Sequence, residues 1–148
     1  MKSFNLTRIS TFCISVIFFS ALVLGQTDQE KKDVQDVLVK VLNNSQSENY
    51  QAASTFFAYE GDNSARNLKD VYNFKDQKEK SKVKRLAKKI KAFQDLSDSY
   101  SVGDISKKSE PAGEYFLVEV LFNSGKQTLK TVFSFIKINE NFKLVEVK

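Results

Sequence analysis

The chain contains no histidine and no tryptophan, and only one cysteine and one methionine. Without histidine it lacks the commonest general base at neutral pH. Cys13, the one cysteine, lies in a segment that we expect to be removed, so thiol nucleophiles, disulfides and thiolate metal sites are not predicted. The glycine-rich phosphate loops and the nucleophile elbow of serine hydrolases are also missing from the sequence. We therefore predict no cofactor, no metal and no assigned catalytic residue.

The first 25 residues have the pattern of a secretory signal peptide. Lys2 and Arg8 precede the apolar run Ile9–Leu24, and the sequence turns polar after Gly25. A basic start followed by a short apolar stretch is typical of a cleavable signal. The alternative is a membrane anchor, but the run is shorter than the roughly 20 residues that span a bilayer. We predict cleavage near Gly25 and a secreted or periplasmic product.

Residues 26–148 are long enough for one domain with a single core. They contain no internal repeat and no linker, and the only proline is Pro111. Losing Lys2 and Arg8 lowers the formal net charge from +5 by two, to +3. So mild a charge favours solubility and does not predict a specific nucleic-acid partner.

Three helices are predicted, over residues 29–43, 50–59 and 77–96. In the first, apolar residues recur at the helical period, from Val34 to Leu42. We expect Asn43-Asn44-Ser45 to end this helix; the triplet also matches a glycosylation acceptor at Asn43, a pattern that is common by chance.

The third predicted helix has a narrow apolar stripe from Val83 to Leu96 and carries the largest basic cluster of the chain. Its basic surface consists of Lys82, Lys84, Arg85, Lys88, Lys89 and Lys91. Two interpretations stay open: a solvated face of a packed helix, or a surface that docks electrostatically on an anionic envelope.

After residue 99 the apolar period changes to two, which predicts strands over residues 100–107, 114–123, 126–138 and 142–147. Gly103 is expected to form a bulge, and Ser124-Gly125 a two-residue hairpin turn.

That turn predicts a register in which Phe116 faces Phe133 and Glu119 faces Lys130. One face of the sheet is then almost wholly apolar and forms the core. The other is mixed, and we expect it to line a ligand cavity or to pack on another subunit. Its members are Tyr115, Leu117, Glu119, Leu121, Val132, Ser134 and Ile136.

The order of elements resembles the nuclear transport factor 2-like, or cystatin-like roll, superfamily, and in particular its small secreted bacterial members. The likeness is carried by helix Val34–Leu42, segment Asn49–Phe57 and the closing strand Phe142–Val147. The resemblance implies an α+β roll, with two to three N-terminal helices on a curved, about four-stranded antiparallel sheet that encloses a cone-shaped cavity. Some members are isomerases or dehydratases that use an Asp–His pair, which this chain cannot match. Others bind small ligands or partner proteins, or dimerise through the sheet.

Three functions stay open at this level. The first is an exported, non-catalytic binding or interaction domain that holds a small apolar ligand in the cavity or a partner, a second copy included, across the sheet. The second is docking of the basic helix. The third is a histidine-free isomerase or hydro-lyase with Glu119 or Asp104 as base and Tyr115 or Tyr100 as proton donor.

Overall fold

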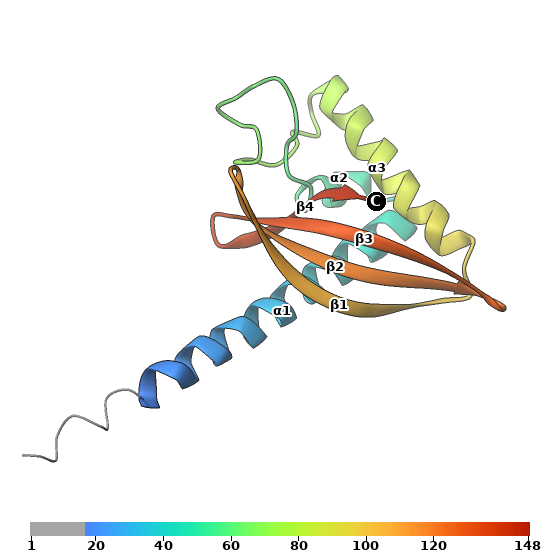
Figure 1. Ribbon diagram of the computed structural model, residues 1–148. Coiled ribbons are helices and arrows are strands. Elements are labelled where there is room, and N and C mark those ends of the chain that lie inside the picture. Colours follow the sequence, from blue (N-terminus) through green and yellow to red (C-terminus); the bar gives the residue numbers. More distant parts are fainter. Residues whose placement is uncertain (1–16) are drawn as a thin grey trace, which may run out of the picture. The chain divides into compact units, whose positions relative to one another are not determined.

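The computed structural model describes residues 17–148, with side chains from Asp28 onward (Figure 1). The chain divides into two compact units, Met1–Lys32 and Asp33–Lys148, and helix α1 (Ile17–Gln46) begins in the first and ends in the second. The expected signal peptide lies outside the described side chains, and its cleavage stays a prediction. No helix in the described part of the chain is long and apolar enough to cross a membrane.

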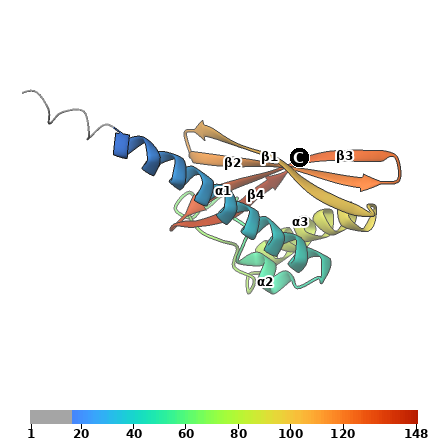
Figure 2. The same cartoon turned by 90° about the horizontal axis from the view of Figure 1, so that it is seen from below.

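The second unit has the predicted α+β fold. After α1 come α2 (Tyr50–Ser54) and α3 (Gln77–Asp95), and then β1 (Ser99–Glu110), β2 (Gly113–Ser124), β3 (Gln127–Ile138) and β4 (Asn141–Val147). The strands form one antiparallel sheet in the order β1-β2-β3-β4. The helices of this unit lie along one face of the sheet (Figure 2).

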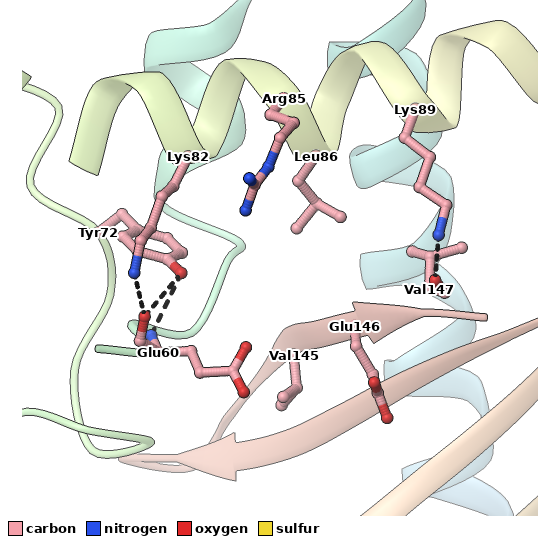
Figure 3. A pocket seen from close by; sticks show the side chains of 9 residues that line it. All are labelled: Glu60, Tyr72, Lys82, Arg85, Leu86, Lys89, Val145, Glu146 and Val147. Carbon is pink, nitrogen blue, oxygen red and sulfur yellow. Dashed lines mark hydrogen bonds between the residues drawn. The ribbon is translucent and has the colours of Figure 1, made fainter. Parts of the chain in front are cut away.

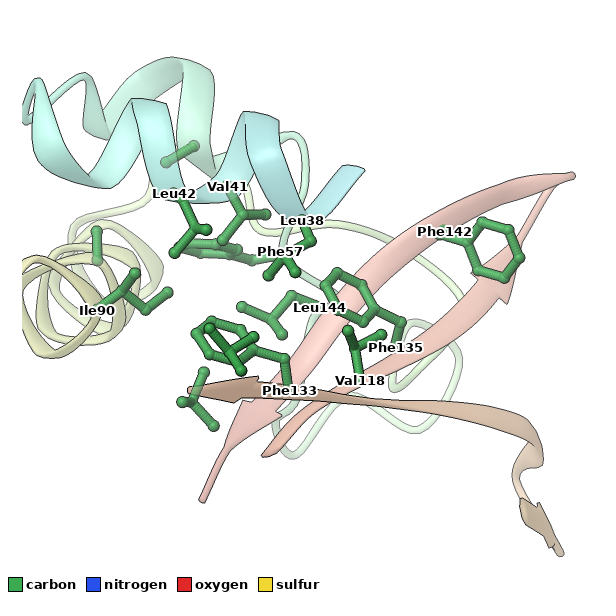
Figure 4. Close-up of a cluster of buried hydrophobic side chains, with 14 of the residues drawn as sticks. Leu38, Val41, Leu42, Phe57, Ile90, Val118, Phe133, Phe135, Phe142 and Leu144 are labelled. Carbon is green, nitrogen blue, oxygen red and sulfur yellow. The ribbon is translucent and has the colours of Figure 1, made fainter. Parts of the chain in front are cut away.

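The core fills the space between these helices and the sheet (Figure 4). Phe116, Phe133 and Phe135 are fully buried there, as is Ile90 of α3. Residues of β2 alternate between buried and half-buried positions, which confirms the predicted core face of this strand. Each fully buried large apolar side chain contributes roughly 1.5–3 kcal/mol through removal from water.

Helix α1 is longer than the predicted helix at both ends. Its backbone is helical from Ile17, and it continues to Gln46 instead of ending at Asn43–Ser45. Near this end the Asn44 side chain donates to the Lys40 carbonyl at 2.7 Å and Ser47 Oγ donates to the Asn43 carbonyl at 2.8 Å. These side chains bond to helix carbonyls instead of breaking the helix.

The prediction of a helix over residues 50–59 is wrong in its second half. Asn49 caps α2 by accepting from Ala52 N, but the helix ends at Ser54. The chain then joins the edge of the sheet: Ala58 N donates to Leu144 O at 2.8 Å and Leu144 N to Phe56 O at 2.7 Å. Pairing with β4 therefore outweighs the local helical pattern.

Helix α3 matches its prediction except at Leu96, which was expected on the buried stripe. The helix ends at Asp95, and Leu96 follows it in a non-helical conformation with 76% of its surface exposed. The change of backbone direction turns this side chain away from the core.

The predicted hairpin turn is wrong by one residue. The turn is Gly125-Lys126, so Ser124 pairs with Gln127 and Phe116 with Phe135. Gly125 has φ +56°, and glycine is favoured at the first position of a type II′ turn. The register therefore moves by two residues, which leaves every side chain on its predicted face. The bulge expected at Gly103 is confirmed by the register shift between Val102 and Ile105.

Candidate functional site

A groove of about 390 Å³ lies on the sheet face that points away from the helices. We call it the outer groove. Tyr115 and Leu117 of β2 and Val132 and Ser134 of β3 line it, and these are four of the seven residues predicted for a ligand or interface site. The remaining lining residues are Glu60, Leu68, Lys108, Glu110, Val145, Glu146 and Lys148.

Two irregular features form one end of this groove. In β4 the register shifts so that Glu146 pairs with Ser134 and Leu144 with Phe135, and Val145 between them has no partner. The loop after α2 closes on itself because Leu68 N donates to Tyr59 O at 2.9 Å. Both features are aperiodic, and no alternation of apolar residues in the sequence points to them.

The other predicted residues of this face lie elsewhere. Ile136 is buried in a small second cluster with Ala58 and Ile138. Glu119 and Leu121 lie further along β2 and do not line the groove. The predicted ion pair of Glu119 with Lys130 is present, but as a diagonal contact, because Glu119 is directly opposite Val132.

Charged side chains surround the outer groove. Lys108 pairs with Glu110 at 2.7 Å and Lys148 with Glu146 at 2.6 Å. Burial, with additional contributions from Glu110, Glu60 and Glu146, raises the pKa of Tyr115. The tyrosine therefore stays a neutral phenol at physiological pH, with an apolar ring and one polar tip facing the groove.

A second hollow, of about 290 Å³, lies between α3 and the end of β4 (Figure 3). We call it the basic pocket. Lys82, Arg85 and Lys89 line it from α3, because spacings of three and four residues place them on the same side of a helix. Tyr72, Leu86 and Val147 also line it, together with Glu60, Val145 and Glu146, which it shares with the outer groove.

Three of the six predicted basic residues, Lys82, Arg85 and Lys89, line the basic pocket. Lys84, Lys88 and Lys91 do not line the basic pocket. The ammonium of Lys84 lies 5.6 Å from the centre of the Tyr50 ring, and Lys91 pairs with Asp95 at 2.9 Å. Only part of the predicted basic surface therefore lies beside this pocket.

One base–donor pair of the isomerase hypothesis, Glu119 with Tyr115, is separated in the structure. Tyr115 and Glu119 are four positions apart on one extended strand, a separation of about 13 Å, well beyond hydrogen-bonding reach. Asp104 lies at the bulge of β1, and Tyr100 contacts Phe122. Among the residues with described side chains, no group of three or more acidic residues is placed to hold a metal ion.

Comparisons with protein-family models, with curated proteins and with solved structures found no match to this chain. The resemblance to the nuclear transport factor 2-like superfamily therefore rests on the order of its elements.

Proposed function

We propose that this protein is an exported, non-catalytic binding domain that holds a small ligand with an apolar body in the outer groove. The observation that carries the proposal is the lining of the groove. Leu117, Val132 and Val145 give it an apolar surface on a sheet face that would otherwise be solvated. Its volume falls within the range of about 300–1,000 Å³ usual for small-molecule sites.

The placement of polar groups supports a ligand rather than simple packing. Ser134 and Tyr115 offer hydroxyl groups among the apolar side chains, and charged pairs lie around them. A few polar groups within an apolar lining orient a ligand and give specificity. The groove lies on the mixed face for which the sequence predicts a ligand or interface site, whereas the helix-facing side of the sheet is filled by the core.

Binding of a neutral, solvatochromic dye such as Nile red tests the proposal. Leu117→Lys places a charge in the groove, and we expect it to weaken dye binding by about tenfold or more, since it removes an apolar contact and adds a cation that must be desolvated. Leu129→Lys is the matched control, because Leu129 is an apolar residue of the same sheet that is 50% exposed and does not line the groove.

Equal dye binding by the two variants would contradict the proposal. Native mass spectrometry of the purified protein adds an independent readout, and we expect a monomer that carries a small co-purified molecule. A dimer that dissociates only in the Leu117→Lys variant would instead identify the outer groove as an interface between two copies.

A further inference from the structure

The basic pocket and the outer groove lie next to each other at the end of β4. Glu60, Val145 and Glu146 line both hollows, so no layer of other residues separates them. Their linings differ: three cations from α3 line the first, whereas the second has three aliphatic side chains of the sheet, Leu117, Val132 and Val145, with charged side chains around them. A ligand that occupies both would need one charged end and one apolar end.

Two of the three cations in the basic pocket are held in place. Lys82 Nζ donates to Glu60 O at 2.9 Å and Lys89 Nζ donates to Val147 O at 2.6 Å (Figure 3). Each ammonium has three donors, so these bonds leave two unused, and a neutral carbonyl does not cancel the charge. The lysines are therefore oriented without being neutralised.

Arg85 lies between these lysines and reaches from α3 into the pocket (Figure 3). Its guanidinium makes no hydrogen bond or ion pair with any residue whose side chain is described. Of the two carboxylates that line the pocket, Glu146 is paired with Lys148 at 2.6 Å. The pocket thus has an excess of positive charge. The planar Arg85 guanidinium lies at its centre, and its hydrogen-bond donors are available to a ligand.

We propose that Arg85, flanked by Lys82 and Lys89, binds the anionic head group of an amphiphile whose apolar body lies in the outer groove. The head group is a carboxylate or a phosphate, because the guanidinium fork matches the oxygens of both in a bidentate manner. This inference rests on the proposed function and specifies its ligand class.

Glu60 provides a sharp test, because its side chain reaches into the same pocket from the opposite wall (Figure 3). Its carboxylate repels an incoming anion. Removing this charge in Glu60→Gln is therefore expected to strengthen anion binding by several-fold, whereas loss of a purely structural residue would weaken it.

Calorimetric titration of the protein, purified after expression of the full chain, compares octanoate, octyl phosphate and neutral 1-octanol below their aggregation concentrations. We expect at least one anion to bind about tenfold or more tightly than octanol, as a charge-assisted bidentate contact implies. Arg85→Gln should abolish that preference and leave octanol affinity unchanged. Lys88→Gln is the matched control, since it removes a cation of α3 that lines neither hollow.

The outcomes separate the two proposals. If octanol binds as tightly as both anions, or if Arg85→Gln and Lys88→Gln behave alike, the head-group assignment is overturned while ligand binding in the outer groove stands. If none of the three compounds binds, the proposed function itself fails. The preference between octanoate and octyl phosphate identifies which head group the pocket selects.

Discussion

Glu79, in the first turn of α3, accepts hydrogen bonds from both terminal nitrogens of Arg66, at 2.7 and 3.2 Å. The same carboxylate accepts from Asn73 N at 2.6 Å, and Arg66 Nε donates to Asp70 at 2.7 Å. The Arg66 guanidinium also lies 4.3 Å from the centre of the Tyr59 ring. These contacts join the loop that carries Glu60 and Leu68 to the start of α3, and so fix the walls of both hollows.

Replacing Glu79 is expected to destabilise the fold. Glu79→Ala removes a bidentate pair and a backbone contact from a side chain that is only 13% exposed. We expect the free energy of unfolding to fall by about 1–3 kcal/mol, measured by urea denaturation. Lys78→Ala, at the neighbouring exposed position, should change it by less than about 0.5 kcal/mol. Equal losses in the two variants would contradict a structural role for this network.

The same network predicts how stability depends on pH. Hydrogen bonds from Arg66 lower the pKa of Glu79 and of Asp70 below their ordinary values. A carboxylate with a lower pKa in the folded state stabilises the fold above its unfolded-state pKa, and this contribution is lost as the pH falls through the folded-state value. Stability should therefore decrease as the pH falls below about 4.5, the ordinary value for glutamate.

Denaturation curves measured between neutral and acidic pH check this expectation. Arg66→Ala removes the main cause of both shifts, so its stability should fall less steeply over the acidic range than that of the unaltered protein. Parallel pH profiles for the two proteins would show that other groups control the acid sensitivity.

Two residues in the turn between β3 and β4 have backbone conformations that are strained for any residue except glycine. Asn139 and Glu140 have φ values of +47° and +62°, the left-handed pair of a type I′ turn, in which Asn-Gly is favoured. Glycine adopts this conformation without the cost of about 1–2 kcal/mol that a Cβ atom brings. Glu140→Gly should therefore raise the free energy of unfolding by about 1 kcal/mol.

Thermal denaturation should show this gain as an increase in Tm of a few degrees. Glu140→Ala is the control, because it removes the exposed contact with Lys137 but keeps the Cβ atom. We expect no increase for alanine. A similar gain in both variants would mean that the side-chain charge, and not the backbone conformation, is responsible.

The sequence predicted the class of the fold and the core face of β2 because burial follows a period of two along this strand. It did not predict the hairpin register. Two registers that differ by two residues place Phe116 and Phe133 on the same face, so alternation cannot separate them. A distant contact favours the observed register: Asp98 accepts from Gly125 N at 2.8 Å and holds this turn from the start of β1.

The candidate site was predictable only in part for a similar reason. Leu117 and Val132 follow from strand alternation, and Arg85 from the basic composition of α3. Glu60 and Val145 depend on a loop closure and on a bulge in β4, which arise from backbone pairing between distant segments. The spacing of apolar residues along the sequence does not indicate such pairing.

Cleavage of the expected signal peptide can be tested without disturbing the core. Val34 is the first fully buried apolar residue among the described side chains, so removing the chain up to Gly25 deletes none of the described core. Phe18→Arg places a charge in the apolar run and should block processing, because the signal then lacks an uninterrupted hydrophobic segment. Gln29→Arg adds the same charge beyond the cleavage point and should be processed normally.

N-terminal sequencing of the exported protein measures the cleavage, and we expect the sequence to begin near Gln26. A product that retains Met1, or equal processing of the two variants, would contradict a cleaved signal peptide.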